Sequence, residues 1–224
     1  MLKASIYGGF FYVFIIRVVS TFVITSMINE NRNFLIHPSI IALGLLLMGV
    51  TALFLGFSFA YVYTRVQSGL EPLRLPVLFI FNTLILLSSS YVLVRSMDYY
   101  RQDKTEKYKQ SLGLTLVLTI IFLISQLVAW KQLIGQGIAI NHSNMASYLY
   151  IISGVHFAHV IVGIPFLAVF YYKAVKQMVE PVSVLVYFTD PVKKRHLKMM
   201  TVYWHFLDAL WIYLVVFFLV NMLF

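Results

Sequence analysis

The strongest constraint on the fold of this chain is a series of six apolar runs separated by short polar segments. Each run reaches the ~20 residues that an α-helix needs to cross the hydrocarbon core of a bilayer. Irregular backbone between the runs must lie outside the hydrocarbon, because its polar groups would otherwise have no hydrogen-bond partners. The sequence therefore predicts an all-α fold, a polytopic membrane bundle of six transmembrane helices. The predicted spans are Ala4–Ile28, Ser39–Tyr63, Leu75–Val94, Ser111–Trp130, Ala146–Tyr171 and Met200–Phe224.

The composition agrees with a membrane protein and argues against other classes. Hydrophobic residues make up 61% of the chain and charged residues only 11%, whereas about a quarter of the residues of a soluble domain are charged. The net charge of +9 would suggest a nucleic acid partner for a soluble protein, but here the basic residues occupy short loops between apolar runs. The absence of cysteine excludes disulfides, thiolate metal sites and iron–sulfur clusters. We expect no nucleic acid partner and no separate soluble domain.

The first predicted span has two alternative interpretations. A lysine followed by an apolar run resembles a secretory signal, but this run is longer than an ordinary signal core and lacks a small-residue cleavage site. A shallow helix in the membrane interface is the second alternative. Arg17, near the middle of the run, either extends along its apolar stem toward one interface or meets a carboxylate or lipid phosphate in the assembly.

The distribution of lysine and arginine over alternate loops predicts the orientation. The loops after the first, third and fifth predicted spans hold twelve of these residues, and the other loops and ends hold four. The positive-inside rule places the first set in the cytoplasm, and both termini then lie on the outer side if all six spans cross. The longest cytoplasmic loop, residues 172–199, contains the apolar stretch Pro181-Val-Ser-Val-Leu-Val-Tyr-Phe188. We expect this stretch to lie in the membrane surface or against a partner, or else to be part of a solvated loop.

The last predicted span contains Asp208, the only acidic residue inside any long apolar run. A charged side chain costs ~2.5–3.5 kcal/mol at the centre of a bilayer on insertion scales, so it normally faces the bundle interior or a partner. His205 precedes Asp208 by three residues and shares its helix face, which predicts a hydrogen-bonded or ionic pair. Trp204 and Trp211 lie in the same stretch.

A second concentration of polar residues lies in the fifth predicted span, where His156 and His159 share a helix face. Pro165 follows and is expected to kink the helix or loosen the turn before it. Neutral imidazoles bind haem and metals, so ligation by His156, His159 and His205 stays open beside anchoring through hydrogen bonds to neighbouring helices or lipid headgroups. Haem needs histidines on facing helices, and a zinc or copper site needs three or four convergent ligands. Anchoring is therefore the favoured interpretation.

Small and polar residues in the other spans predict contacts between helices. A stripe of small residues in the second predicted span lets another helix backbone approach closely. Two prolines in the stretch Glu71-Pro-Leu-Arg-Leu-Pro76 mark the start of the third helix. Hydrogen bonds across helices are expected from polar side chains in the third and fourth predicted spans. The stripe consists of Gly49, Ala52, Gly56 and Ala60, and the polar side chains are those of Asn82, Ser88, Ser89, Ser90, Gln126 and Trp130.

Five stretches, one in each of the last five predicted spans, carry a resemblance to a known family. The last span opens with Tyr203-Trp-His-Phe-Leu-Asp208 before Trp211, and the span before it contains Ser153-Gly-Val-His-Phe-Ala-His-Val-Ile-Val-Gly163. The others are Leu55-Gly-Phe-Ser-Phe-Ala-Tyr61, Phe81-Asn-Thr-Leu-Ile-Leu-Leu-Ser-Ser89 and Phe122-Leu-Ile-Ser-Gln-Leu-Val-Ala-Trp130. In this order they resemble subunit III of the haem–copper (cytochrome c type) terminal oxidases, over about residues 36–224.

The resemblance implies an accessory, non-redox subunit of a proton-pumping oxidase in an aerobic respiratory chain. In that family haem and copper belong to subunits I and II, while subunit III packs against subunit I and binds phospholipid. It thus implies no cofactor in this chain, partners in subunits I and II, bound phospholipid and a respiratory (bacterial cytoplasmic) membrane; membership of a larger respiratory supercomplex stays open. The positions that match polar bundle or lipid-contacting sites of the family are His156, His159, Trp204, His205, Asp208 and Trp211, none of them a redox ligand.

Two features depart from the family. Many members have a carboxylate in the helix that matches the second predicted span, where this chain reads Met48-Gly-Val-Thr-Ala52. The family also occurs mainly with five or seven helices, and this chain offers six. We therefore expect an N-terminal transmembrane helix and loop in residues 1–35 and a five-helix bundle in residues 36–224. The alternative function is a stand-alone membrane cytochrome or transporter, built on His156, His159, His205 and Asp208.

Overall fold

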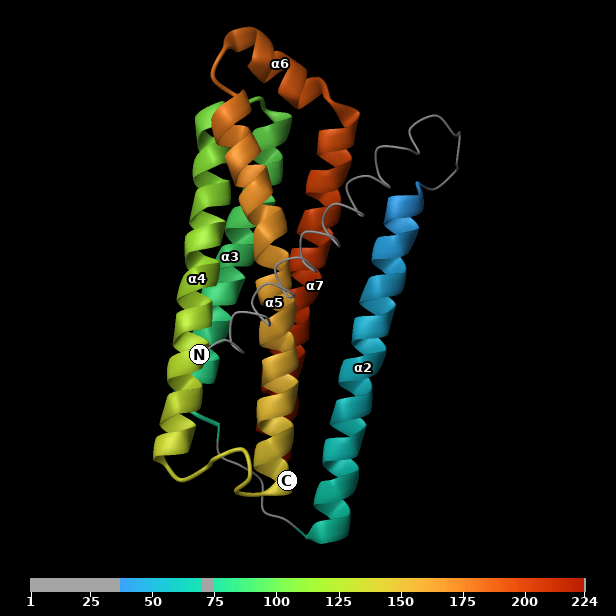
Figure 1. Cartoon of the computed structure of the whole chain (residues 1–224), viewed down its shortest axis with the longest axis vertical. Coiled ribbons are helices and arrows are strands. Elements are labelled where there is room, and N and C mark those ends of the chain that lie inside the picture. The colour runs from blue at the N-terminus through green and yellow to red at the C-terminus, as the bar shows by residue number, and fades with distance from the viewer. Residues whose placement is uncertain (1–36, 70–74, 224) are drawn as a thin grey trace, which may run out of the picture. The chain divides into compact units, whose positions relative to one another are not determined.

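The computed structural model describes residues 37–69 and 75–223, in which α-helices are the only regular secondary structure (Figure 1). All of them except the nine-residue α6 are long and apolar enough to cross a membrane. The predicted all-α polytopic membrane bundle is confirmed, with five of the six predicted spans present as helices. The remaining predicted span, residues 4–28 with Arg17, lies outside the described residues. The helices are α2 (Pro38–Ser68), α3 (Val77–Arg101), α4 (Thr105–Gly135), α5 (Asn144–Gln177), α6 (Pro181–Thr189) and α7 (Pro191–Leu223).

The chain divides into two compact units, residues 1–46 and 47–224. Of the first unit the structure describes residues 37–46, which contain the start of α2. There Nδ1 of His37 accepts a hydrogen bond from the Ser39 amide at 3.3 Å and lies 2.8 Å from the Ser39 hydroxyl. This side chain therefore satisfies one of the amides that a helix N-terminus leaves without a partner in the helix. The second unit contains the rest of α2 and α3 to α7.

The helices extend beyond the apolar runs that predicted them. With 31, 34 and 33 residues, α4, α5 and α7 are each about 45–50 Å long, compared with about 30 Å for the hydrocarbon core. Polar turns can continue these helices because the added residues lie where water is available. The first turn of α7 is capped by Asp190, whose Oδ1 accepts a hydrogen bond from the Val192 amide at 2.9 Å.

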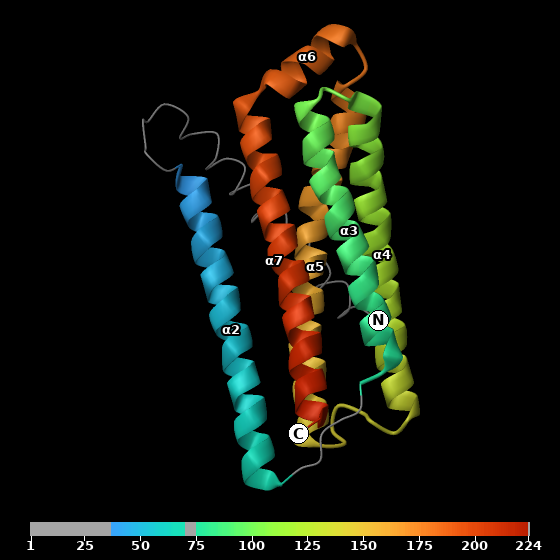
Figure 2. The same ribbon diagram turned by 180° about the vertical axis from the view of Figure 1, so that it is seen from behind.

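Helices α3 and α4 form an antiparallel hairpin joined by residues 102–104 (Figure 2). Asp103 supplies the left-handed residue of the turn, with a φ of 54°, a conformation that Asp and Asn tolerate better than most residues. Between the helices, Nδ2 of the fully buried Asn82 donates to Oε1 of Gln126 at 2.8 Å, which confirms the expected bond across helices. The other buried polar residues of these two helices are small, and they are Ser89, Ser96, Ser111, Thr115 and Thr119.

Helix α7 packs against α3 and α5, and α5 packs in turn against α4. Aromatic side chains of α7 lie directly over Gly163 of α5, where an added Cβ would be 2.8 Å from the Trp204 ring and 3.1 Å from the Tyr203 ring. Glycine at this position therefore lets the two helices meet around a buried tryptophan. Pro165 lies inside α5, which continues as one helix to Gln177.

Residues 47–68 of α2 contact the other helices through large side chains. The buried Tyr61 ring lies 6.0 Å from Tyr148 and 5.6 Å from Phe218, and Tyr213 Oη donates to Ser58 Oγ at 2.9 Å. The small-residue stripe faces elsewhere: Gly49, Ala52 and Gly56 are exposed, and no atom lies within 4 Å of a Cβ added at either glycine. The prediction that this stripe packs is therefore wrong for the described helices of this chain, because aromatic side chains on another face make the contacts.

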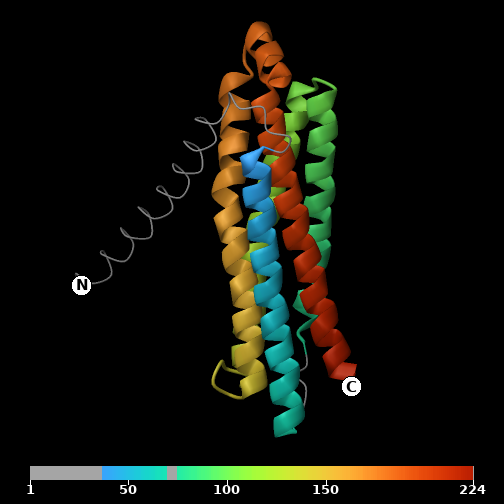
Figure 3. The same ribbon diagram turned by 90° about the vertical axis from the view of Figure 1, so that its right-hand side faces the viewer.

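The short helix α6 crosses the end of the second unit between α5 and α7 (Figure 3). Its Tyr187 and Phe188 are buried against Tyr100 of α3 and Tyr108 of α4, with ring centroids 5.0–6.3 Å apart. Tyr100 Oη donates to the Tyr187 carbonyl at 3.0 Å. Burial raises the pKa of the Tyr187 hydroxyl, which therefore stays protonated near neutral pH. The apolar stretch predicted at residues 181–188 is thus an ordered helix anchored on the bundle.

Candidate functional site

Trp211 of α7 occupies the middle of the bundle, in contact with three other helices. Its ring centroid lies 5.6 Å from that of Phe79, 5.2 Å from that of Phe122 and 5.0 Å from that of His156. Its Nε1 donates to Thr83 Oγ1 at 3.2 Å. The tryptophan therefore fills the space between α3, α4 and α5, and its polar edge has a partner, as a buried indole requires.

His156 is fully buried against Trp211 and Phe122, with the Phe122 ring centroid 6.1 Å away. Neither of its ring nitrogens has a hydrogen-bond partner within the described part of the chain. In the described chain His156 is thus a packing element of the bundle.

Asp208 and His205 meet a common neighbour on the facing helix. The Ser90 hydroxyl of α3 is hydrogen-bonded to Nδ1 of His205, and Asp208 lies near the same serine. No direct ion pair between His205 and Asp208 is found among the described side chains, so the predicted pairing is replaced by contacts that both residues make with Ser90. The Asp208 side chain is 4% exposed, and its Oδ2 has no hydrogen-bond partner in the described chain.

Ser90 is one of three consecutive serines expected to bond across helices, and the sequence did not show which of the three would face α7. Three consecutive serines in an apolar run indicated hydrogen bonds between helices, but the serine that faces α7 depends on how α3 is rotated in the bundle. In the structure Ser88 bonds the carbonyl of its own helix at Leu84, and Ser89 is buried without a partner for its hydroxyl in the described chain. Only the third serine reaches across to α7.

Replacing Ser90 with alanine is expected to destabilise the bundle by about 0.5–2 kcal/mol, the range for a hydrogen bond between helices in a membrane. The loss leaves the buried Asp208 carboxylate and the His205 ring without their shared partner. Ser88→Ala is the matched control, because its hydroxyl bonds only within α3 and is exposed. Denaturation in mixed micelles, followed by circular dichroism, measures the free energy of unfolding of both variants. Equal decreases in the two would contradict the conclusion that Ser90 bonds across to α7.

The other predicted site residues line the contact between α5 and α7. Nδ1 of His159 lies 2.7 Å from the Val155 carbonyl of its own helix, and the His159 carbonyl accepts a bond from Tyr203 Oη at 2.9 Å. The His159 ring also lies 6.1 Å from Phe54 of α2. Trp204 is buried against Gly163. Except for Arg17, which lies outside the described residues, these side chains are found in the contacts between helices.

The histidines do not form a ligand cluster. Among residues 37–69 and 75–223, no group of three or more His, Asp or Glu side chains could hold a metal ion. His156, His159 and His205 have three separate environments: an aromatic pocket, a carbonyl of α5 and a serine of α3. A zinc or copper site needs its ligands to converge on one point, so the geometry favours polar contacts between helices over the alternative of ligation.

Comparison with known proteins gives one consistent result. The model of the family "Cytochrome c oxidase subunit III" matches residues 59–221. A cytochrome c oxidase subunit 3 from Synechocystis sp. is 30% identical over 199 residues, which cover 84% of this chain and 77% of the relative. The protein of the same name from Thermostichus vulcanus is 27% identical over 187 residues, covering 80% and 86%. A probable quinol oxidase subunit 3 from Staphylococcus haemolyticus is 26% identical over 144 residues, covering 64% and 66%.

Proposed function

The chain belongs to the cytochrome c oxidase subunit III family, and we propose from that premise that it supports a proton-pumping respiratory oxidase through packing and lipid contacts. As subunit III of a haem–copper oxidase of the cytochrome c or quinol type, it carries no catalytic centre and no redox cofactor of its own. In the proposal it packs against subunit I, subunits I and II hold the haem and copper, and phospholipid covers part of its surface.

The observation that carries the proposal is the extent of the family match. Residues 59–221 run from within α2 to the end of α7 and include all the described polar positions of the candidate site. We propose that His156, His159, Trp204, His205, Asp208 and Trp211 hold the helices together and contact lipid, so that subunit I meets a rigid surface. In this proposal residues 36–224 are the subunit III bundle, and residues 1–35, with Arg17, add an N-terminal helix and loop.

The orientation is part of the proposal. The turn between α3 and α4 and the segment around α6 lie at the same end of the second unit (Figure 1). These two segments carry most of the basic residues, whereas Arg65 and Lys131 are the ones described near the opposite end. By the positive-inside rule, the α6 end faces the cytoplasm and the C-terminus faces outward, as does the N-terminus if residues 4–28 also cross the membrane.

A tag on this chain tests the proposal when the complex is purified in mild detergent and its subunits are identified by mass spectrometry. Haem- and copper-bearing subunits should co-purify in fixed ratio, and the isolated chain should contain no haem. Stoichiometric haem in the isolated polypeptide, or purification without such partners, would contradict the proposal. Protons pumped per electron, and the decay of activity during turnover, should both be compared in vesicles for complexes with and without this chain.

A further inference from the structure

The segment around α6 exposes apolar side chains at one end of the bundle. Val179, Val182, Leu185 and Val186 are 60–75% exposed, although the opposite face of α6 is buried. Three of these four, Val182, Leu185 and Val186, belong to α6 itself. They lie on one face of the helix, and the buried Tyr187 and Phe188 lie on the opposite face. Exposed apolar groups of this kind on an ordered surface helix mark a contact with a membrane or a partner.

The bundle holds α6 in a fixed position. The Lys109 ammonium of α4 donates to the Met178 carbonyl at 3.0 Å, and Lys193 of α7 lies 4.1 Å from the centroid of the Tyr187 ring. Together with the bond from Tyr100 to the Tyr187 carbonyl, these contacts tie both ends of the segment to three helices. The outward apolar face is therefore a permanent feature of the folded chain.

The position of α6 along the bundle fits the headgroup layer. Tyr171 and Tyr172 near the end of α5 are the aromatic residues expected at the membrane–water interface. The end of α5 at Gln177 lies five residues beyond Tyr172, about 7–8 Å at the helical rise. Since the headgroup region is about 5–8 Å deep on each side, α6 begins within or just above it.

A groove of about 560 Å³ runs beside α6, with cations at its edges. Lys176 and Lys193 line it together with Val182, Ser183 and Val186. Lys193 Nζ donates to Gln177 Oε1 at 3.2 Å and lies 3.9 Å from Asp190 Oδ2, while Glu180 is the acidic residue of the lining. The groove thus combines ammonium groups with an apolar floor, which matches a phosphate joined to acyl chains.

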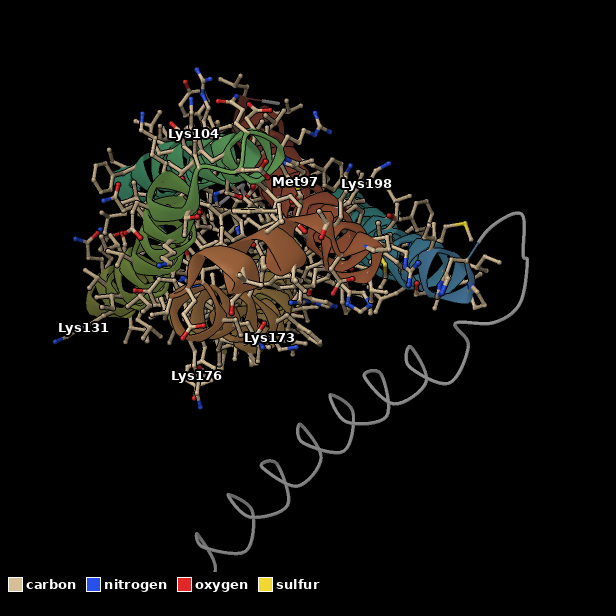
Figure 4. All side chains as sticks on the ribbon, turned by 90° about the horizontal axis from the view of Figure 1, so that it is seen from above. Met97, Lys104, Lys131, Lys173, Lys176 and Lys198 are labelled. Atoms are coloured by element: carbon tan, nitrogen blue, oxygen red, sulfur yellow. The ribbon has the colours of Figure 1, made fainter. Side chains whose placement is uncertain are left out.

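The surroundings strengthen the positive charge. Residues 172–199 contain six lysines and arginines but only two acidic residues. Lys173 and Lys176 extend from the outer side of α5 at this end of the bundle (Figure 4), and Lys176 Nζ donates to Tyr172 Oη at 3.3 Å. An anionic leaflet attracts such a basic segment, and the attraction falls off within a Debye length of the surface.

We propose that the groove between α5, α6 and α7 binds the headgroup phosphate of an anionic phospholipid between Lys176 and Lys193, with the upper acyl chains over Val182 and Val186. The site is separate from the α3–α7 contacts of the candidate site. It rests on the proposed function only in that the chain lies in a bilayer. A failed lipid test and a failed co-purification are therefore distinguishable results.

The test uses the full chain in vesicles. The chain has no cysteine, so Ser183→Cys takes an environment-sensitive fluorophore inside the groove. Two sets of phosphatidylcholine vesicles are prepared. One contains brominated phosphatidylglycerol and the other contains the same mole fraction of brominated phosphatidylcholine, with the bromine atoms high on the acyl chains in both. Phosphatidylglycerol should quench the fluorophore more strongly. Each lysine near an anionic surface contributes about five-fold in relative affinity, so Lys176→Gln should lower the preference about five-fold, and Lys176→Gln with Lys193→Gln should nearly abolish it.

Two matched variants complete the design. Lys131→Gln removes a lysine near the opposite end of the bundle and should leave the preference unchanged, whereas Glu180→Gln should increase it. Equal quenching by the two lipids in the parent chain, or a preference that survives the double substitution, would overturn the proposal. Absence of quenching by either lipid would also overturn it, because the groove would then be covered by protein or water.

Discussion

Trp211→Ala is expected to lower the free energy of unfolding by about 3 kcal/mol, the lower end of the range for truncating a buried tryptophan. In a membrane the transfer of apolar surface from water contributes little to helix association, but the cavity and the lost ring contacts remain. The indole touches α3, α4 and α5 at once, through Phe79, Phe122 and His156. Its removal therefore loosens three helix contacts, and Thr83 loses a hydrogen bond.

Titration with a denaturing detergent, followed by circular dichroism, measures this change without relying on tryptophan fluorescence. Trp211→Phe should lower the free energy of unfolding clearly less. A ring still fills most of the space, and only the bond to Thr83 and part of the contact area disappear. Val216→Ala is the control on the same helix, because Val216 is 50% exposed. A loss for Trp211→Ala no larger than that for Val216→Ala would show that the ring is not central to the bundle.

Gly163→Ala is the second substitution with a large expected effect, a loss of about 1–3 kcal/mol from overpacking. The added methyl group would lie 2.8 Å from the Trp204 ring, closer than real contacts allow, and 3.1 Å from the Tyr203 ring, closer than most. Trp204 is 2% exposed, so its ring has no open space into which to turn. Helices α5 and α7 must then separate, and Gly163→Val should cost more than Gly163→Ala.

Gly154→Ala is the matched control for this substitution. Gly154 belongs to the same helix, and no atom lies within 4 Å of a Cβ added there. Alanine also has the higher helix propensity, by about 1 kcal/mol, so this variant should be neutral or stabilising. Opposite signs at the two glycines are the expected result in the same detergent titration, and similar losses at both would contradict the close approach at Gly163.

The membrane fold could be predicted because long apolar runs leave few alternatives to spanning helices. The ends of the helices could not be predicted. Five of the nine residues 191–199 of α7 are basic, and their helical conformation depends on the Asp190 cap and on packing around Leu197. The helical state of residues 181–189 likewise depends on Tyr187 and Phe188 finding Tyr100 and Tyr108. Hydropathy carries no information about such partners.

Helical spacing predicted which polar side chains share a helix face, but not the partners that they meet on other helices. Helical spacing placed His205 and Asp208 on one face correctly, yet Ser90 from α3 links them in the structure. The small residues Gly49, Ala52 and Gly56 would allow another helix to pack closely, but they do not determine that one does. The larger Phe54 and Tyr61 of this helix are buried instead. Which faces meet depends on the rotation of each helix, and this follows from the sum of all contacts.

The short turn between α3 and α4 has a consequence for how the chain enters the membrane during synthesis. Alone in the hydrocarbon, α3 would expose the Asn82 amide to lipid, and α4 would expose that of Gln126. Residues 102–104 are few enough for the two helices to partition as one hairpin, in which the amides already satisfy each other. We therefore expect α3 and α4 to enter the membrane as a pair, and lengthening this turn should slow insertion before it weakens the finished protein.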